Sequence, residues 1–217
     1  MLIGATLITQ INQQRQQALT SARLELDLLK RNLQPHFLMN SLMLIIEWIE
    51  HQPNAAVKFV ESLACELRQL INYSSKTSIS LAEETSLCSH HLSVMSYRYD
   101  CRFELMIEGD YEQFQQVKIP PAVIHTQIEN AFAHNKMNQD TQFILIVSGT
   151  EQQVTLELQS NCTRARVDKK KTEHTGTGEN YIKARLSELF GDRFEYHSFQ
   201  QGQLWITRIS FKPSKAQ

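Results

Sequence analysis

The sequence has few of the residues that build tight turns and disulfide scaffolds. Among 217 residues there are seven glycines, five prolines and four cysteines. So few glycines and prolines favour a helix-rich protein. The cysteines are scattered, without a C-x-x-C pair, which suits a reducing compartment better than a disulfide framework or a zinc site. The net charge of -1 excludes a strong field for nucleic acid or an anionic membrane.

The N-terminal apolar stretch is too short to span a bilayer. Residues 1–10 are largely apolar, but a transmembrane helix needs about 20 residues. They also lack the basic flank and the small-residue cleavage site of a secretory signal. They either begin a coiled coil or are the last part of a transmembrane helix, and we favour the second interpretation. We therefore expect a membrane-embedded sensory segment upstream of this chain.

Apolar residues three and four apart predict a long helix over residues 8–50, interrupted at Pro35. A turn at residues 51–54 leads into a second helix, which Asn54 caps and which runs to about Tyr73. Two antiparallel helices joined by so short a loop cannot bury both faces alone, so we expect them to dimerise as a four-helix bundle. The apolar positions of the second helix are Val57, Val60, Leu63, Leu67 and Ile71.

From Ile79 onwards the pattern predicts an α+β layer structure, with several antiparallel strands and helices packed on one face. Ser80–Glu84 is typical of a helix cap and first turn, and that helix should run to about Tyr99. We place the domain boundary between residues 78 and 79, giving domains 1–78 and 79–217. Further helices are expected over residues 120–136 and 179–190, with Gly191 as a C-cap. Strands are expected over residues 102–108, 142–148, 153–159, 193–199 and 203–211.

The segment QPHFLMNSL, residues 34–42, sets one histidine directly after a helix-breaking proline. Pro35 should kink the helix and can tip His36 out of the packed seam. A neutral imidazole is a competent nucleophile near pH 7. Asn40, one helical turn later, could orient the ring. The alternative interpretation is a helix-capping or core histidine.

A polar pair lies within the helix expected over residues 120–136. Glu129 and Asn130 are adjacent there, and helix neighbours point about 100° apart, so both can lie at the border of a buried face and look into one cleft. Carboxylate and amide oxygens suit Mg²⁺, a hard cation. His134, four residues after Asn130, projects on the same side. The alternative is a surface helix with ordinary polar residues.

Gly176, Thr177 and Gly178 precede the helix expected over residues 179–190. Glycines at this position let backbone N–H groups approach a phosphate, and a helix N-terminus carries partial positive charge. Lys170, in a run of three lysines upstream, is a candidate phosphate ligand, although such a run is also typical of a solvated loop. The motif is weak when taken alone.

Together these segments occur in the order, and near the separations, of the LytS/YehU-type sensor histidine kinases, including the alginate-regulator-like branch. The string at residues 34–42 resembles their phosphoacceptor box, and the segment around Asn130 resembles their N-box. Ser80–Glu84 resembles the start of the helix that opens their ATP-binding domain, and Gly176–Gly178 resembles their last glycine box. The resemblance covers roughly residues 20–212.

The resemblance implies a dimerisation hairpin followed by a GHKL/Bergerat-type ATP-binding α/β sandwich. It also implies a reaction in which the γ-phosphoryl group of ATP moves to His36 and then to an aspartate of a response regulator. Asn130 would ligate Mg²⁺, and His134 would belong to the same nucleotide site. Glu129 would hold or polarise the phosphate-bound water shell or the attacking group, and Asn40 would orient the imidazole.

The resemblance further implies partners and a location. We expect a homodimer and a response-regulator receiver domain as partner, with the LytTR type as one candidate, and no nucleic acid. The chain would act at the cytoplasmic side of the bacterial inner membrane, downstream of the sensory segment.

The chain departs from the family pattern in its glycine boxes. Many relatives carry D-x-G-x-G, whereas residues 160–165 here contain neither that aspartate nor its glycines. Asn161 could still accept from the adenine amino group, as a weaker neutral acceptor. Glu179 stands where an apolar residue is usual and would repel a nucleotide unless the lysines or Mg²⁺ offset it. Tyr181 stands where asparagine is common.

These departures leave a second hypothesis open. The chain would then be a degenerate, non-catalytic relative, acting as a dimeric interaction module with weak or no ATP binding. A third hypothesis, a GHKL ATPase that does not phosphorylate itself, leaves the segment at residues 34–42 without a role.

A histidine-rich metal site is not expected. His90 and His91, with His51 or His125, could be proposed as ligands. Adjacent histidines on a helix diverge in direction, however, and no carboxylate lies at ligand spacing.

Overall fold

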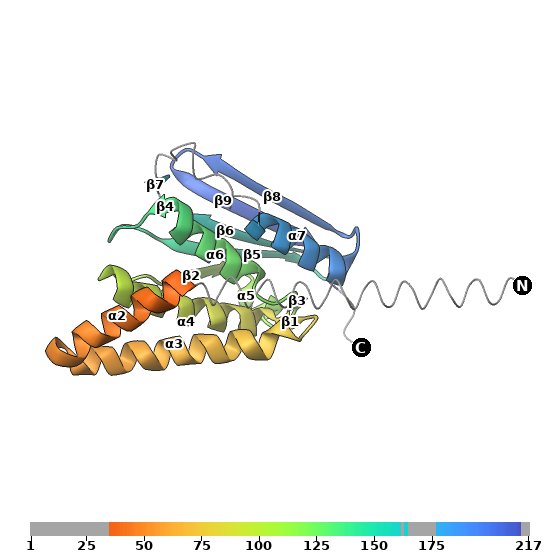
Figure 1. Ribbon diagram of the computed structural model, residues 1–217. Coiled ribbons are helices and arrows are strands. Elements are labelled where there is room, and N and C mark those ends of the chain that lie inside the picture. The colour runs from red at the N-terminus through yellow and green to blue at the C-terminus, as the bar shows by residue number, and fades with distance from the viewer. Residues whose placement is uncertain (1–34, 162, 165–176, 214–217) are drawn as a thin grey trace, which may run out of the picture.

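A hairpin of two helices opens the part of the chain that this computed structural model describes, residues 35–161, 163–164 and 177–213. Helix α2 (Pro35–His51) and helix α3 (Pro53–Ser74) are joined at Gln52 (Figure 1). The predicted cap at Asn54 is wrong. Helix α3 begins at Pro53, and Gln52 is its N-cap without a side-chain hydrogen bond. Proline suits this first position because its missing N–H needs no partner there.

Helix α3 packs along α4 (Leu81–Tyr99) as well as α2. An aromatic cluster joins the three helices, with the ring of Phe59 5.8 Å from that of Trp48 and 6.0 Å from that of Tyr97. The predicted apolar stripe of α3 lies largely outside this contact, because Val57 and Ile71 are more than half exposed. Helix α3 therefore has a second apolar face. Its buried residues are Ala56, Phe59, Glu66, Leu70 and Ser74.

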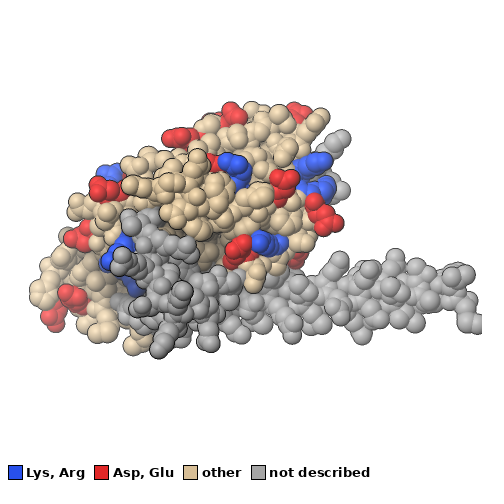
Figure 2. Space-filling model, turned by 90° about the horizontal axis from the view of Figure 1, so that it is seen from above, with Lys and Arg blue, Asp and Glu red and all other residues tan. Residues whose placement is uncertain are grey.

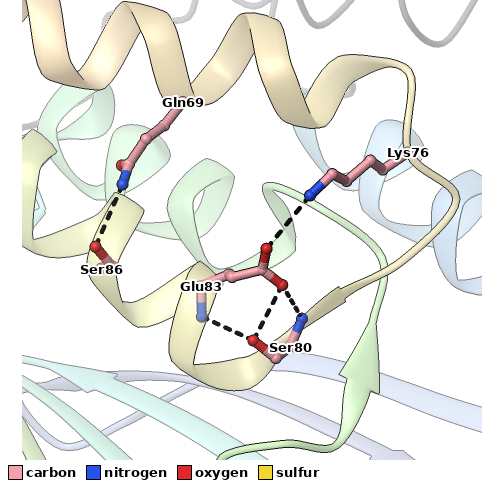
Figure 3. A network of polar contacts seen from close by, with 5 residues as sticks. All are labelled: Gln69, Lys76, Ser80, Glu83 and Ser86. Atoms are coloured by element: carbon pink, nitrogen blue, oxygen red, sulfur yellow. Dashed lines mark hydrogen bonds and ion pairs between the residues drawn. The ribbon is translucent and has the colours of Figure 1, made fainter.

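A capping box starts α4, as the sequence predicted (Figure 3). The Ser80 hydroxyl accepts from the Glu83 N–H at 3.1 Å, and the Glu83 carboxylate accepts from the Ser80 N–H at 2.7 Å. Lys76, just after α3, pairs with Glu83 at 3.3 Å. Gln69 of α3 donates to the Ser86 hydroxyl at 3.3 Å. These contacts fix the connection between the hairpin and the C-terminal lobe, residues 79–213.

The C-terminal lobe is built on a five-stranded sheet in the order β2-β5-β6-β9-β8. Strand β2 pairs with β5 in parallel, and the other neighbours are antiparallel. The expected strand at residues 102–108 begins later, at Leu105. Gly202, with φ of +60°, lies in the predicted hairpin turn between β8 and β9. The strands are β2 (Leu105–Gly109), β5 (Phe143–Thr150), β6 (Gln153–Ser160), β8 (Phe194–Gln201) and β9 (Leu204–Phe211).

Short elements that the sequence did not predict complete the lobe. Strand β1 (Ile79–Ser80) pairs with β3 (Lys118–Ile119), and β4 (Asn135–Lys136) pairs with β7 (Thr163–Arg164). Helix α5 (Tyr111–Phe114) precedes β3. Two-residue strands carry no detectable alternation, so pattern reasoning has nothing to find in them.

Three helices, α4, α6 (Val123–His134) and α7 (Thr177–Phe190), pack with the sheet around one hydrophobic core (Figure 1). Helix α6 is shorter than expected, because Ala122 is left-handed (φ +61°) and residues 135–136 form β4. Gly191 ends α7 with φ of +61°, as its C-cap position predicted. The predicted class, a helical hairpin followed by a mixed α/β sandwich, is confirmed.

The C-terminal end of α3 is tied to α7 by a buried guanidinium. Arg185 Nη2 donates to the carbonyl oxygens of Ser74 and Lys76, each at 3.3 Å. Its Nη1 donates to Glu188 at 2.9 Å. Carbonyls at a helix C-terminus lack intrahelical partners, so a buried cation is a favourable partner for them.

Candidate functional site

The N-terminus of α6 is held by a carboxylate from another helix. Glu84 of α4 is fully buried and accepts from the backbone N–H groups of Ala122 at 2.7 Å, Ile124 at 2.7 Å and His125 at 3.0 Å. Burial raises the pKa of Glu84, and these three hydrogen bonds oppose that rise. A carboxylate at a helix N-terminus satisfies orphan donors and complements the helix dipole. The helix that carries Glu129 and Asn130 is therefore rigidly placed.

Gly178 lies directly against Asn130. A Cβ built on Gly178 would meet Asn130 Nδ2 at 2.6 Å and Oδ1 at 2.7 Å. Only glycine leaves room for this approach. The fold therefore brings the second and third sequence motifs together, at the meeting of α6 and α7. Glu129 and Asn130 are both half-buried at this place, as expected for the border of a buried face.

The carboxylate of Glu179 forms an ion pair within α7, which offsets its negative charge. Its carboxylate lies 2.7 Å from Lys183, one turn later in α7, and both side chains are about half exposed. Tyr181 is buried and donates its hydroxyl proton to the Pro121 carbonyl at 3.2 Å. These two departures from the family pattern thus have local roles, in an ion pair and in the packing of α7 on the start of α6.

Asn161 is engaged by the backbone of a neighbouring loop. Its Oδ1 accepts from the Gln142 N–H at 2.8 Å, and its Nδ2 donates to the Asp140 carbonyl at 2.7 Å. This bridge links the end of β6 to the start of β5. The adenine-binding role of Asn161 stays a prediction, and any such contact must share an oxygen that already accepts one hydrogen bond.

Several predicted site residues fall partly or wholly outside the described structure. His36 and Asn40 lie in the first two turns of α2, His134 ends α6 and Thr177 begins α7, but their side chains are not described. Lys170 and Gly176 lie outside the described residues altogether. The kink predicted at Pro35 depends on preceding residues that are also outside them.

One buried polar cluster was not predicted from the sequence. Glu66 of α3 accepts through Oε1 from His91 Nδ1 of α4 at 2.7 Å and from His125 Nε2 of α6 at 3.2 Å. No carboxylate lies at ligand spacing from these histidines in the sequence, but Glu66 reaches them from a different helix. The candidate ligand atoms lie within 4.8 Å of one another. Both imidazoles already bond to one oxygen, so the arrangement is a hydrogen-bonded cluster rather than a formed metal centre.

His90 diverges from His91, as expected for helix neighbours. Its ring nitrogens contact Cys65 Sγ at 3.3 Å and Gln69 Oε1 at 3.1 Å. The three members of the cluster lie on three helices, and their sequence separations carry no period that could have indicated their meeting. A buried Glu in an otherwise apolar helical stripe was the one available signal.

The comparisons with known proteins agree with these motifs. The family model described as "Histidine kinase" matches residues 24–103. The sensor histidine kinase BtsS of Escherichia coli is 29% identical over 183 residues, which cover 83% of this chain. The sensor protein LytS of Staphylococcus epidermidis is 26% identical over 204 residues, which cover 88% of this chain. Residues 24–103 therefore match the histidine kinase family, and the chain is similar to sensor histidine kinases over most of its length.

The chain spans about a third of the length of the curated relatives that it matches, 32% of BtsS and 34% of LytS. A solved structure described as a bacterial phosphotransferase is 8% identical, with a TM-score of 0.52 over 87% of this chain and 96% of that one. That likeness concerns the fold. Among the helices of the described residues, none is long and apolar enough to cross a membrane.

Proposed function

We propose that this chain is the phosphotransfer and ATP-binding portion of a sensor histidine kinase that autophosphorylates His36 and passes the phosphoryl group to a response regulator. The contact of Gly178 with Asn130 supports the proposal most strongly, because it brings together two motifs expected to bind nucleotide that lie 48 residues apart (178 − 130). Glu84 fixes α6 so that Glu129 and Asn130 are presented together.

The donor set at this place fits the group that the proposal requires. Asn130 offers an amide oxygen and Glu129 a carboxylate, both hard oxygen ligands at half-buried positions. Bound Mg²⁺ would neutralise charge on the phosphate oxygens during transfer. Asn130 would hold the ion, while Gly178 and Thr177, at the N-terminus of α7, would offer backbone N–H groups to phosphate.

The chain's own residues would carry the transfer. A ring nitrogen of His36 forms a bond to the γ-phosphorus as the bond from phosphorus to the ADP oxygen breaks, and ADP leaves. Glu129 polarises the attacking group and takes up the ring proton released by the phosphorylated imidazole. Asn40 orients the ring. In the second step, a carboxylate of the regulator accepts the phosphoryl group, and the nitrogen regains a proton.

The proposal includes a homodimer, and the exposed surface of the hairpin supports it. Helices α2 and α3 expose an apolar face that a single chain leaves in solvent, and a second hairpin would cover it as a four-helix bundle. A receiver domain, of the LytTR type or another, is the proposed partner. The whole protein is proposed to act at the cytoplasmic side of the bacterial inner membrane. The exposed residues are Met39, Leu42, Met43, Ile46, Ile49, Val57, Val60 and Ile71.

Autophosphorylation tests the proposal. Incubation with radiolabelled ATP and Mg²⁺ should label the protein with an acid-labile, base-stable phosphate. His36→Gln should abolish the label, and His51→Gln, which changes an exposed histidine of the same helix, should leave it unchanged. Labelling that survives His36→Gln would contradict the assignment of the phosphorylated residue.

A second candidate function is a dimeric interaction module that does not turn over ATP. The engagement of both ends of the Asn161 amide by backbone favours it, because the replacement for the family's adenine-binding aspartate already has partners. Calorimetry with a non-hydrolysable ATP analogue and Mg²⁺ separates the two functions. Tight binding that Asn130→Ala abolishes supports the kinase, and absence of binding supports the module.

A further inference from the structure

The cluster of Glu66, His91 and His125 joins the hairpin to the nucleotide-binding helix. Each of the three residues is at most 4% exposed, and each comes from a different helix. Through one oxygen, Glu66 of α3 binds both α4 and α6. The rings of His91 and His125 also contact each other edge to face, with centroids 4.6 Å apart. This is a direct polar link from α3 to the helix that carries Asn130.

The hydrogen bonds fix where protons must lie. An ionised carboxylate only accepts, so His91 Nδ1 and His125 Nε2 must both carry hydrogen. With two neutral rings the cluster keeps a net negative charge in the core, which is costly without compensation. One more proton gives a carboxylate, an imidazolium and an imidazole, with no net charge. The charge balance therefore favours a cluster that holds this additional proton, on His125 Nδ1 or His91 Nε2, two buried nitrogens that have no hydrogen-bond partner within the described residues.

The directions of the pKa shifts of Glu66 and His125 agree with one additional proton in the cluster. Burial would raise the pKa of Glu66, but His91 and His125 hold that pKa well below its ordinary value. Burial would lower the pKa of His125, but the hydrogen bond and charge of Glu66, followed by the charges of Glu129 and Glu84, raise that pKa above 6.5. The carboxylate stays ionised and His125 is the favoured site of the additional proton.

We propose that Glu66, His91 and His125 form a proton-holding clasp, which positions α6 against α3 and loosens when the cluster loses its additional proton. The three are positioning residues, because they act through the placement of α6 rather than on a nucleotide. The clasp makes the docking of the hairpin on the C-terminal lobe depend on pH.

The other titratable groups near the clasp do not replace its proton. On α4, the Glu84 carboxylate is occupied by three backbone N–H groups. Burial, followed by the charge of Glu84, raises the pKa of the Cys88 thiol well above its ordinary value, so this thiol stays neutral. On α6, Glu129 is half-buried and its negative charge favours the protonated ring. On α3, the neighbouring Cys65 contacts His90.

The direction of the pH effect follows from the raised pKa of His125. The clasp is complete below the ordinary histidine pKa and opens as pH rises through the higher pKa of the folded state. Above that pH, Glu66 faces two neutral rings as an uncompensated buried charge. Its Oε2 has no hydrogen-bond partner within the described residues that could offset this loss.

Histidine NMR tests the proton directly. In the unmodified protein, one ring of the cluster should remain protonated at a pH above the ordinary histidine pKa of 6.5. His125→Gln should remove that resonance. Neutral cluster rings throughout the range from about pH 6 to about pH 8 would overturn the proposal.

Amide hydrogen exchange of α3 tests the positioning. After correction for the intrinsic pH dependence of exchange, protection over residues 60–70 should fall at least about tenfold as pH rises from about 7 to about 9. His125→Gln should give a flat profile, because its amide can still donate to Glu66 but cannot titrate. His90→Gln, the matched control on α4, should keep the original profile.

The variant Glu66→Gln provides a second test of the clasp. If His125→Gln does not fold, Glu66→Gln keeps an acceptor for both rings, removes the charge that holds the proton, and should also flatten the profile. A titratable profile in either folded variant would overturn the proposal. So would a change on adding Zn²⁺ or a chelator, which would indicate a metal site. Neither measurement needs ATP, so failure here is distinguishable from failure of the proposed kinase function.

Discussion

Gly178 and Asn130 share one small space, in which the asparagine side chain occupies the volume that any larger residue at position 178 would need. The contact makes the start of α7 and the middle of α6 a single structural unit. It also means that a change in α7 reaches the candidate Mg²⁺ ligand without altering that ligand itself.

Gly178→Ala should weaken nucleotide binding with little loss of fold stability. The new methyl group would lie 2.6 Å from Asn130 Nδ2 and must displace that side chain. We expect the dissociation constant for an ATP analogue with Mg²⁺ to rise about tenfold or more, about 1.4 kcal/mol, by calorimetry. Ser187→Ala, an exposed change in the same helix, is the control. Unchanged binding in Gly178→Ala would place the nucleotide elsewhere.

Glu84→Gln should destabilise the C-terminal lobe far more than Glu83→Gln. The amide that replaces Glu84 can accept through only one atom and turns an N–H group towards buried backbone donors, which we expect to cost about 2–4 kcal/mol. The change at Glu83 weakens a partly exposed capping box and should cost about 1 kcal/mol or less. Urea unfolding followed by circular dichroism measures both. Equal effects would show that Glu84 does not hold α6.

Ile46→Glu should convert the proposed dimer to a monomer. Ile46 is 67% exposed in the single chain, at the centre of the apolar face of α2. In a four-helix bundle two such carboxylates would be buried without partners, so we expect the dimer dissociation constant to rise at least about 100-fold, about 2.7 kcal/mol. Light scattering across a dilution series reports this. Lys58→Glu, an exposed change on α3, should leave the dimer intact.

Acidification should destabilise the protein through Glu66. Its pKa is lowered in the folded state, so its contribution to stability is present above the ordinary value of 4.5 and is lost as pH falls below that value. One such group contributes a slope of at most about 1.4 kcal/mol per pH unit. Glu66→Gln should remove this part of the slope in urea unfolding at several acidic pH values. Glu50→Gln, at an exposed position, should not.

Local chemistry made much of the fold predictable. The capping box of Ser80 and Glu83 fixed the start of α4 to the residue, because both partners lie within one helical turn. Gly191 marked the end of α7, and Gly202 the last hairpin, because a positive φ favours glycine. The cap of α3 was misplaced at Asn54, since a proline at the first helical position can start a helix without a side-chain cap.

The parts of the site that were not predictable depend on long-range contacts. The N-terminus of α6 is capped by Glu84, which lies 38 residues before Ala122 in the sequence. Local capping rules look for a side chain at the N-cap itself, and Ala122 offers none. The cluster of Glu66 with His91 and His125 needs three helices to pack before its members meet. The contact of Asn130 with Gly178 is also long-range, but both residues stand in short strings that resemble family motifs, so the sequence could single them out.

Helix α3 is attached to the C-terminal lobe at two points along its length. Near its middle, Glu66 forms a hydrogen bond with His125, and at its end the carbonyl of Ser74 accepts a hydrogen bond from Arg185. Two attachment points resist rotation of α3 relative to the lobe, whereas a single point would allow it. A rotation of α3 about its own length therefore carries α6 and α7 with it.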